Sequence, residues 1–138
     1  MAETKYGKYL VTQCMAQRDD GEKQITTRKG DFFEGASFSM NCRYITKAYL
    51  MVAETHVHDF DQYLCFFGSS PNDVTDFDAE IEIYLGEEKE KHIINSPTIV
   101  RVPAGLPHDP INIVKLNKPV LHVDVAMASK YAKNQKGI

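Results

Sequence analysis

Short apolar segments rich in β-branched and aromatic residues recur along the chain between residues 43 and 126, and some of them alternate with polar residues. In the segment 79–85, for example, Ile81, Ile83 and Leu85 are separated by Glu82 and Tyr84. A period of two turns successive side chains to opposite faces, so it indicates strands with one buried and one solvated face. With Gly, Pro and Asn turns between the segments, this pattern predicts strands at residues 43–55, 62–67, 79–85, 91–94, 98–102, 111–116 and 120–126.

Short strands without any long helical pattern predict an all-β fold, either a β-sandwich or a β-barrel. A chain of 138 residues suits a single domain with one hydrophobic core. We place the barrel at residues 35–127. The polar residues 1–34 are expected to form an N-terminal arm or edge strands, and residues 128–138 a short C-terminal tail.

Charge and composition exclude several classes of function. The net charge is −3, so no basic field is available to attract nucleic acid. No apolar run approaches the ~20 residues of a membrane span, and the first residues lack the apolar core of a secretory signal. Three cysteines without CxxC spacing indicate reduced thiols rather than disulfides. We therefore expect a cytoplasmic protein with no nucleic-acid or membrane partner.

Two of the five histidines, His56 and His58, stand two positions apart at the end of a predicted strand. Strand alternation places both imidazoles on one face, which is how a strand presents two nitrogen ligands to one metal ion. A surface pair or a hydrogen-bonded core pair would have the same spacing. The residues around the pair, and a second stretch about fifty positions later, add further information.

The two stretches resemble the two signature motifs of the cupin superfamily. The first motif has the form His-x-His, three or four residues, Glu, about six residues, Gly. The second has the form Pro-x-Gly, two residues, His, three residues, Asn. The matching residues here are His56, His58, Gln62 and Gly68 in the first stretch, and Pro103, Gly105, His108 and Asn112 in the second. The second motif matches at all four positions, whereas the first has Gln62 in place of Glu and its Gly one residue early.

The resemblance implies a jelly-roll β-barrel of the small single-domain cupin type. It also implies a metal site made by His56, His58 and His108, with the side-chain oxygen of Gln62 as fourth ligand. Imidazole and amide donors suit one divalent transition metal, whether Fe, Mn, Ni, Zn or Cu, and do not suit Ca or Mg. Because these ligands are neutral, such a site favours an anionic small-molecule substrate or ligand. A glutamate at position 62 would add charge, so we expect Gln62→Glu to tighten metal binding.

Several polar residues near the motifs are alternatives or possible additions to this site. Asp61 is an alternative oxygen ligand to Gln62, although a solvated loop explains it equally well. His122 and Asp124 share one face of a predicted strand and could line the pocket or lie on an exposed face. Arg101 could bind a substrate carboxylate, or simply cover the outside of the barrel. No catalytic residue can be assigned from the sequence.

We favour a metalloenzyme in which the metal acts as a Lewis acid on a carbonyl or carboxylate, as in isomerases, lyases, decarboxylases and cyclases. An iron-dependent dioxygenase is one alternative, and a non-catalytic ligand-binding or sensing cupin is another. A third is an apo structural cupin. A pocket with a buried acid or base would favour catalysis over storage. Exposed sheet edges and an arm at residues 6–15 lead us to expect a homodimer.

Overall fold

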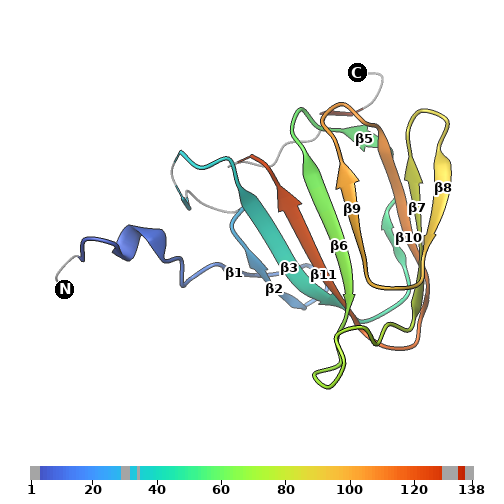
Figure 1. Cartoon of the computed structure of the whole chain (residues 1–138), viewed down its shortest axis with the longest axis horizontal. Helices are drawn as coiled ribbons and strands as arrows, with labels where there is room; N and C mark the ends of the chain where they lie inside the picture. The colour runs from blue at the N-terminus through green and yellow to red at the C-terminus, as the bar shows by residue number, and fades with distance from the viewer. Residues whose placement is uncertain (1–3, 29–31, 34, 129–133, 136–138) are drawn as a thin grey trace.

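The computed structural model describes residues 4–28, 32, 33, 35–128, 134 and 135. Within these residues the strands form two antiparallel sheets that pack face to face (Figure 1). The first sheet has the order β1 (Met15–Gln17), β2 (Lys23–Thr26), β3 (Ser39–Ile45), β11 (Val120–Ala126), β6 (Gln62–Gly68), β9 (Thr98–Val102). The second has the order β12 (Asn134–Gln135), β5 (His56–Val57), β10 (His108–Leu116), β7 (Ala79–Leu85), β8 (Glu90–Ile94), with β4 (Leu50–Val52) also paired to β10.

The alternation pattern located most of these strands correctly. Three of the expected segments, 79–85, 98–102 and 120–126, have the bounds of β7, β9 and β11. The strand expected at 43–55 was wrong in extent, because the chain leaves the first sheet after Ile45 and enters the second at Leu50. The strand expected at 111–116 begins earlier, at His108, where β10 meets β5.

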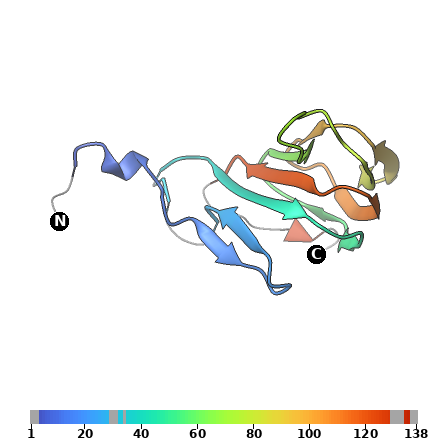
Figure 2. The same ribbon diagram turned by 90° about the horizontal axis from the view of Figure 1, so that it is seen from below.

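Both ends of the described chain lie at the edges of the sheets. β1 and β2 pair with each other and join the first sheet through β3. Before them, residues 4–14 extend away from the sheets and include the short 3₁₀ turn Gly7–Tyr9 (Figure 2). Tyr6, Tyr9 and Leu10 are all more than half exposed on this arm, and the homodimer expected from it stays a prediction. Of the expected tail at 128–138, residues 134–135 pair with β5, while 129–133 and 136–138 lie outside the described residues. No helix in the described residues is long or apolar enough to cross a lipid bilayer.

The hydrophobic core fills only part of the space between the sheets. Ile81 and Ile83 on β7 are almost fully buried, and Phe66 on β6 reaches the same cluster from the opposite sheet. On the inner face of the first sheet the apolar residues give way to polar ones toward one end, where Gln62 begins β6 and Asp124 lies on β11. The core therefore closes one end of the sandwich and leaves the other end for a polar cavity.

We expect Ile81→Ala to lower the free energy of unfolding by about 2 to 5 kcal/mol, because it leaves a void in a close-packed core. Ile99→Ala is the matched control, since Ile99 is 62% exposed on β9 and should cost under about 1 kcal/mol. Urea unfolding followed by circular dichroism measures both values. Equal losses in the two variants would contradict the assignment of the core.

Candidate metal centre

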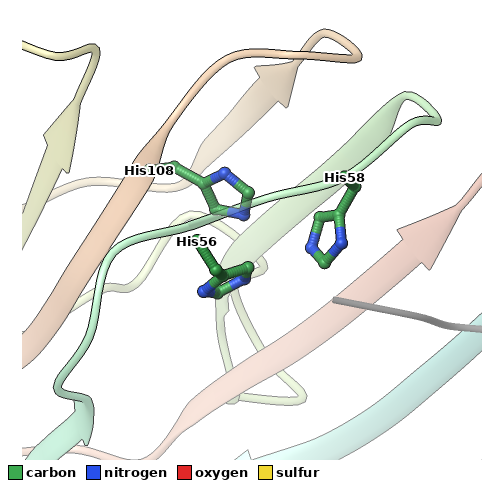
Figure 3. Close-up of side chains that lie close together, drawn as sticks. All are labelled: His56, His58 and His108. Carbon is green, nitrogen blue, oxygen red and sulfur yellow. The ribbon is translucent and has the colours of Figure 1, made fainter. Parts of the chain in front are cut away.

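Pairing of β5 with β10 brings the histidines of the two sequence stretches together. His56 lies directly opposite His108 in this ladder, and their ring centroids are 4.3 Å apart. His58 follows β5 and its ring lies 4.8 Å from that of His56 and 5.0 Å from that of His108. One nitrogen of each ring lies within 4.8 Å of the others, and all three side chains are buried (Figure 3). The spatial cluster expected from the sequence is thus present.

A loop that precedes β10 fixes the relative position of the two stretches. The backbone N–H of Gly105 donates to the carbonyl oxygen of His58 at 2.9 Å. Gly105 has a φ of +84°, a conformation that residues with a Cβ rarely adopt. Asp61 holds the same loop, because its Oδ1 accepts from the N–H of Ala104 at 2.9 Å. The Pro-x-Gly turn therefore serves to bring His108 to the pair on β5.

Hydrogen bonding orients the ring of His108 and leaves one nitrogen available. Nδ1 lies 3.0 Å from the carbonyl oxygen of Leu106, and since a carbonyl only accepts, Nδ1 is the protonated nitrogen. Nε2 then carries a lone pair, and it is buried without a hydrogen-bond partner. Burial lowers the pKa of His108 and keeps the ring neutral, as a metal ligand requires.

Asp109 is part of the site, although the sequence analysis did not single it out. Its side chain is 1% exposed, and Oδ2 lies 2.7 Å from Nδ1 of His56 and 3.8 Å from Nε2 of His108. Neither carboxylate oxygen has a well-aligned hydrogen bond, and Nδ1 of His56 also lies 3.3 Å from the carbonyl oxygen of Glu54. A carboxylate against Nδ1 favours the tautomer in which the lone pair of His56 is on Nε2.

Simple alternation predicts that Asp109 and His108 point to opposite faces, which is why Asp109 was missed. The register of β10 shifts between His108 and Ile111, so the strand contains a bulge and all of His108, Asp109 and Ile111 are buried. Asp109 itself has a φ of +85°. The available signal was Pro110, because a proline inside a strand often marks a bulge.

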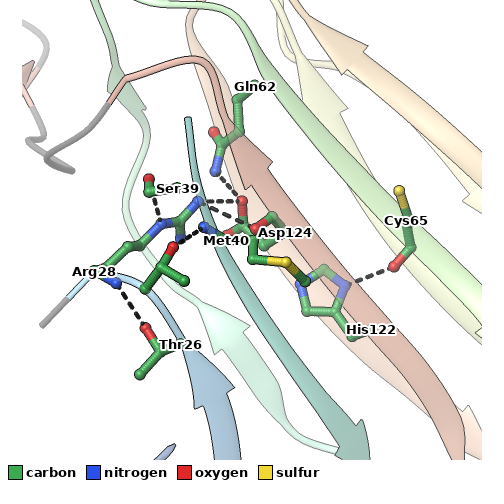
Figure 4. Close-up of polar contacts among 9 residues, drawn as sticks. Thr26, Arg28, Ser39, Met40, Gln62, Cys65, His122 and Asp124 are labelled. Atoms are coloured by element: carbon green, nitrogen blue, oxygen red, sulfur yellow. Dashed lines mark hydrogen bonds and ion pairs between the residues drawn. The ribbon is translucent and has the colours of Figure 1, made fainter. Parts of the chain in front are cut away.

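Gln62 contributes a further buried polar atom without a hydrogen-bond partner. Its side chain is 2% exposed, and Nε2 donates to Oδ1 of Asp124 at 2.8 Å (Figure 4). A carboxylate cannot donate, so this contact fixes which end of the amide is nitrogen. Oε1 is left buried and unpaired on the wall of the cavity that His56 and His108 also line.

Asp124 is held in its charged form by the N-terminal part of the chain. Arg28, just after β2, places its guanidinium 2.9 Å from Oδ1 of Asp124. Burial by itself would raise the pKa of Asp124, but the hydrogen bond and charge of Arg28, with the amide of Gln62, outweigh it and lower that pKa. An ionised Asp124 then keeps the amide of Gln62 in one orientation.

His122 is a buried neutral base on the inner face of β11. Its Nδ1 lies 2.9 Å from the carbonyl oxygen of Cys65, and its ring stacks on Phe66 with centroids 4.5 Å apart. Burial lowers the pKa of His122 to about 4. Because Nδ1 donates to the carbonyl, Nε2 is left as an acceptor, and the side chain belongs to the lining of the cavity.

Other residues considered from the sequence lie elsewhere. Asp61 uses Oδ2 in an ion pair with Arg101 at 2.8 Å, so both of its oxygens are engaged away from the histidines. Arg101 is 60% exposed in its side chain and does not line the cavity. Arg43 was not singled out by the sequence analysis, yet it is buried on the inner face of β3 and lines the cavity.

These groups fit a single divalent transition metal. The cluster offers neutral imidazoles as ligands. Nε2 of His108 and Oε1 of Gln62 are buried and have no hydrogen-bond partner. Leaving such atoms unpaired costs free energy, and a bound ligand or ion in contact with them would remove that cost. The cavity beside them has a volume of about 390 Å³, enough for a small molecule.

The depressed pKa of His122 makes stability depend on pH. The unfolded chain protonates this histidine near its ordinary pKa of ~6.5, whereas the folded chain keeps it neutral down to about 4. Between these values the unfolded state binds more protons, so stability falls as the pH is lowered through this window. We expect the metal-free protein to lose about 2 to 3 kcal/mol at His122 between pH 7.5 and pH 4.5.

Urea unfolding of the metal-free wild type and of His122→Gln at a series of pH values tests this. The variant should lose less stability on acidification than the wild type, by about the amount assigned to His122. His108 remains in both proteins, so its own depressed pKa cancels in the comparison. Identical slopes would mean that His122 is not neutral in the folded state.

No protein-family model matches the chain, and no curated protein does either. Among solved structures, an oxalate decarboxylase superposes on 86% of this chain and 29% of its own, with a TM-score of 0.58 and 10% identity. The polyketide cyclase RemF from Streptomyces resistomycificus superposes on 91% of this chain and 75% of its own, with a TM-score of 0.53 and 10% identity. An Fe(II) structure of HppE covers 81% of this chain and 54% of its own, with a TM-score of 0.51 and 13% identity.

The chain therefore spans less than a third of the oxalate decarboxylase chain and about half of the HppE chain. The superpositions show a shared fold, and identities of 10% to 13% leave the chemistry open. The fold that they share is the one expected from the two sequence motifs. With two antiparallel sheets and the motif histidines gathered between them, the chain has the cupin jelly-roll fold.

Proposed function

We propose that this protein is a metal-dependent enzyme that acts on a small anionic molecule. His56, His58 and His108 would hold one divalent transition metal, and Oε1 of Gln62 would be the fourth protein ligand. The observation that carries the proposal is the buried cluster of His56, His58 and His108, in which Nε2 of His108 has no hydrogen-bond partner. Oε1 of Gln62, on the wall of the same cavity, has none either. When bound, the metal supplies a Lewis acid for a carbonyl or carboxylate oxygen.

Asp109 compensates for the missing acidic ligand. Three imidazoles and an amide leave the full charge of a divalent ion unneutralised within the ligand set. The buried carboxylate of Asp109 lies 2.7 Å from Nδ1 of His56 and 3.8 Å from Nε2 of His108, so its charge is close to two of the ligands. It would attract the metal and hold His56 in the ligating tautomer.

The lining of the cavity supports catalysis rather than storage. An apolar pocket would suit a bound or sensed ligand, but this cavity contains the buried acid Asp109 and the neutral base His122. Arg43, which has no ion pair among the described residues, adds positive charge to the same wall, and this charge favours an anionic substrate. A lyase, isomerase, decarboxylase or cyclase reaction fits these groups best.

Metal analysis of protein purified without a chelating column tests the site. We expect one divalent ion per chain in the wild type and none in His108→Ala, which removes a nitrogen ligand. Gln62→Ala should bind the metal about tenfold more weakly, because a neutral amide is the weakest donor of the four. Atomic emission and chelator competition give the stoichiometry and the affinity.

His92→Ala is the matched control, since His92 is half exposed beside Glu90 on β8 and should leave metal binding unchanged.

The hydrogen bond from Gln62 to Asp124 also changes what we expect of Gln62→Glu. A glutamate cannot donate to Asp124 and would face a second carboxylate, so the added charge need not tighten binding. A wild-type protein that takes up no metal after reloading would overturn the proposed function.

Asp109→Asn should weaken metal binding about 10-fold to 100-fold, because it removes the carboxylate that orients His56. The two side chains have nearly the same shape, so the folded structure should persist. Asp59→Asn is the control, as Asp59 is exposed and lies between His58 and Phe60. Chelator competition measures both affinities. Equal affinities in the two variants would show that Asp109 has no role at the metal.

If iron-loaded protein consumes dioxygen with an added carboxylate, the dioxygenase alternative would replace Lewis-acid chemistry. Oxygen-electrode measurements with Fe(II) and with Zn(II) separate the two, because zinc has no redox chemistry.

A further inference from the structure

Arg43 is a buried cation that lacks a carboxylate partner. It lies on the inner face of β3 and is 9% exposed. Its single hydrogen bond among the described residues runs from one terminal nitrogen to the hydroxyl of Tyr49 at 2.7 Å. None of the ion pairs among those residues includes it, whereas Arg28, also at the cavity, is paired with Asp124. A buried guanidinium without a counter-ion is costly, so its retention calls for an anion.

The sheet register places Arg43 away from the histidine cluster but on the same cavity. On the first sheet Arg43 is opposite His122 on β11, and His122 is opposite Phe66 on β6. Gln62 begins β6, four residues before Phe66, and four residues of strand span roughly 13 Å. Both Arg43 and Gln62 line the cavity of about 390 Å³ that His56 and His108 also line. A ligand held at the metal would therefore have its far end toward Arg43.

The free edge of the guanidinium matches a carboxylate. Tyr49 uses one terminal nitrogen, which leaves the remaining N–H groups available for two parallel hydrogen bonds. A carboxylate accepts such a pair in its own plane. His122 next to Arg43 offers an acceptor nitrogen, so a hydroxyl near the carboxylate would also find a partner.

We propose that Arg43 binds the distal carboxylate of an elongated substrate whose other oxygen-bearing end occupies the metal centre. The substrate class is thus an acid with two separated oxygen-bearing groups, such as a dicarboxylate or a hydroxy or oxo acid. This inference rests on the proposed function, because the near end of the ligand needs the metal. It replaces the sequence-based candidate Arg101, which lies on the surface in an ion pair with Asp61.

Binding of matched probes to Co(II)-loaded protein tests the proposal. The probes are the dicarboxylates from malonate to adipate and the monoamide of each, which has the same length but one carboxylate fewer. We expect at least one dicarboxylate of the series to bind about 10-fold to 100-fold more tightly than its monoamide, as a charged hydrogen-bonded pair would give. Calorimetry measures the affinities, and the visible spectrum of Co(II) reports whether the near end reaches the metal.

Arg43→Gln should abolish this preference, because it weakens the binding of the dicarboxylate more than that of the monoamide. Arg43→Lys keeps the charge but not the two-pronged geometry, so it should lose most of the preference and also serves if Arg43→Gln fails to fold. Arg101→Gln is the control and should behave as the wild type. Retention of the full preference in Arg43→Lys and Arg43→Gln would overturn the proposal.

Failure of this inference can be told apart from failure of the proposed function. Protein that takes up no Co(II) overturns both. Protein that takes up Co(II) but prefers no dicarboxylate over its monoamide overturns only the role of Arg43, and the metal centre stands. A preference that survives without any change in the Co(II) spectrum would place the ligand away from the metal, and would equally contradict the proposal.

Discussion

The backbone pairing of β5 with β10 is the contact on which the site depends. It sets His56 opposite His108 and brings together two stretches of chain that are about fifty residues apart. The ladder between these strands is short, and the hydrogen bond from Gly105 to His58 reinforces it from the adjoining loop. Few backbone contacts therefore hold three imidazoles at ligand spacing, and the larger sheets keep both strands in place.

Only some of the charges in the cavity are paired. Asp109 lies against the imidazole of His56, whereas Arg28 and Asp124 form an ion pair. Arg43 has no such partner among the described residues. An interior of low dielectric strengthens each of these interactions and makes a buried charge without a partner costly. The distribution of pairs thus separates residues that build the cavity from the one that we propose to recognise a substrate.

The same strands serve stability at one end and chemistry at the other. Along β6 the inner face runs from polar Gln62 to Phe66, which is fully buried in the hydrophobic core. Along β11 it runs from Asp124 through His122 to the buried Val120. Polar groups at the open end reduce the apolar area that folding can bury, and the core at the closed end offsets that loss. Stiff strands also hold the functional side chains more rigidly than loops would.

Local sequence patterns were enough to locate most of the strands and to identify the three histidines. Alternation is a local property, so the bounds of β7, β9 and β11 and the shared face of His56 and His58 follow from neighbouring residues. The motif around His108 was also readable, since each of its turns is encoded by Pro or Gly within a few positions. These features need no knowledge of which strands pair.

The surroundings of the histidines depend on how distant strands pair. Asp109 enters the site because of a bulge in β10, which reverses the alternation that the sequence predicts. The orientation of Gln62 depends on Asp124, sixty-two residues away in the chain. Arg43 faces the cavity without a partner because β3, β11 and β6 lie side by side in the first sheet. Each of these outcomes depends on pairing between distant strands, and a local pattern of polar and apolar residues does not carry that information.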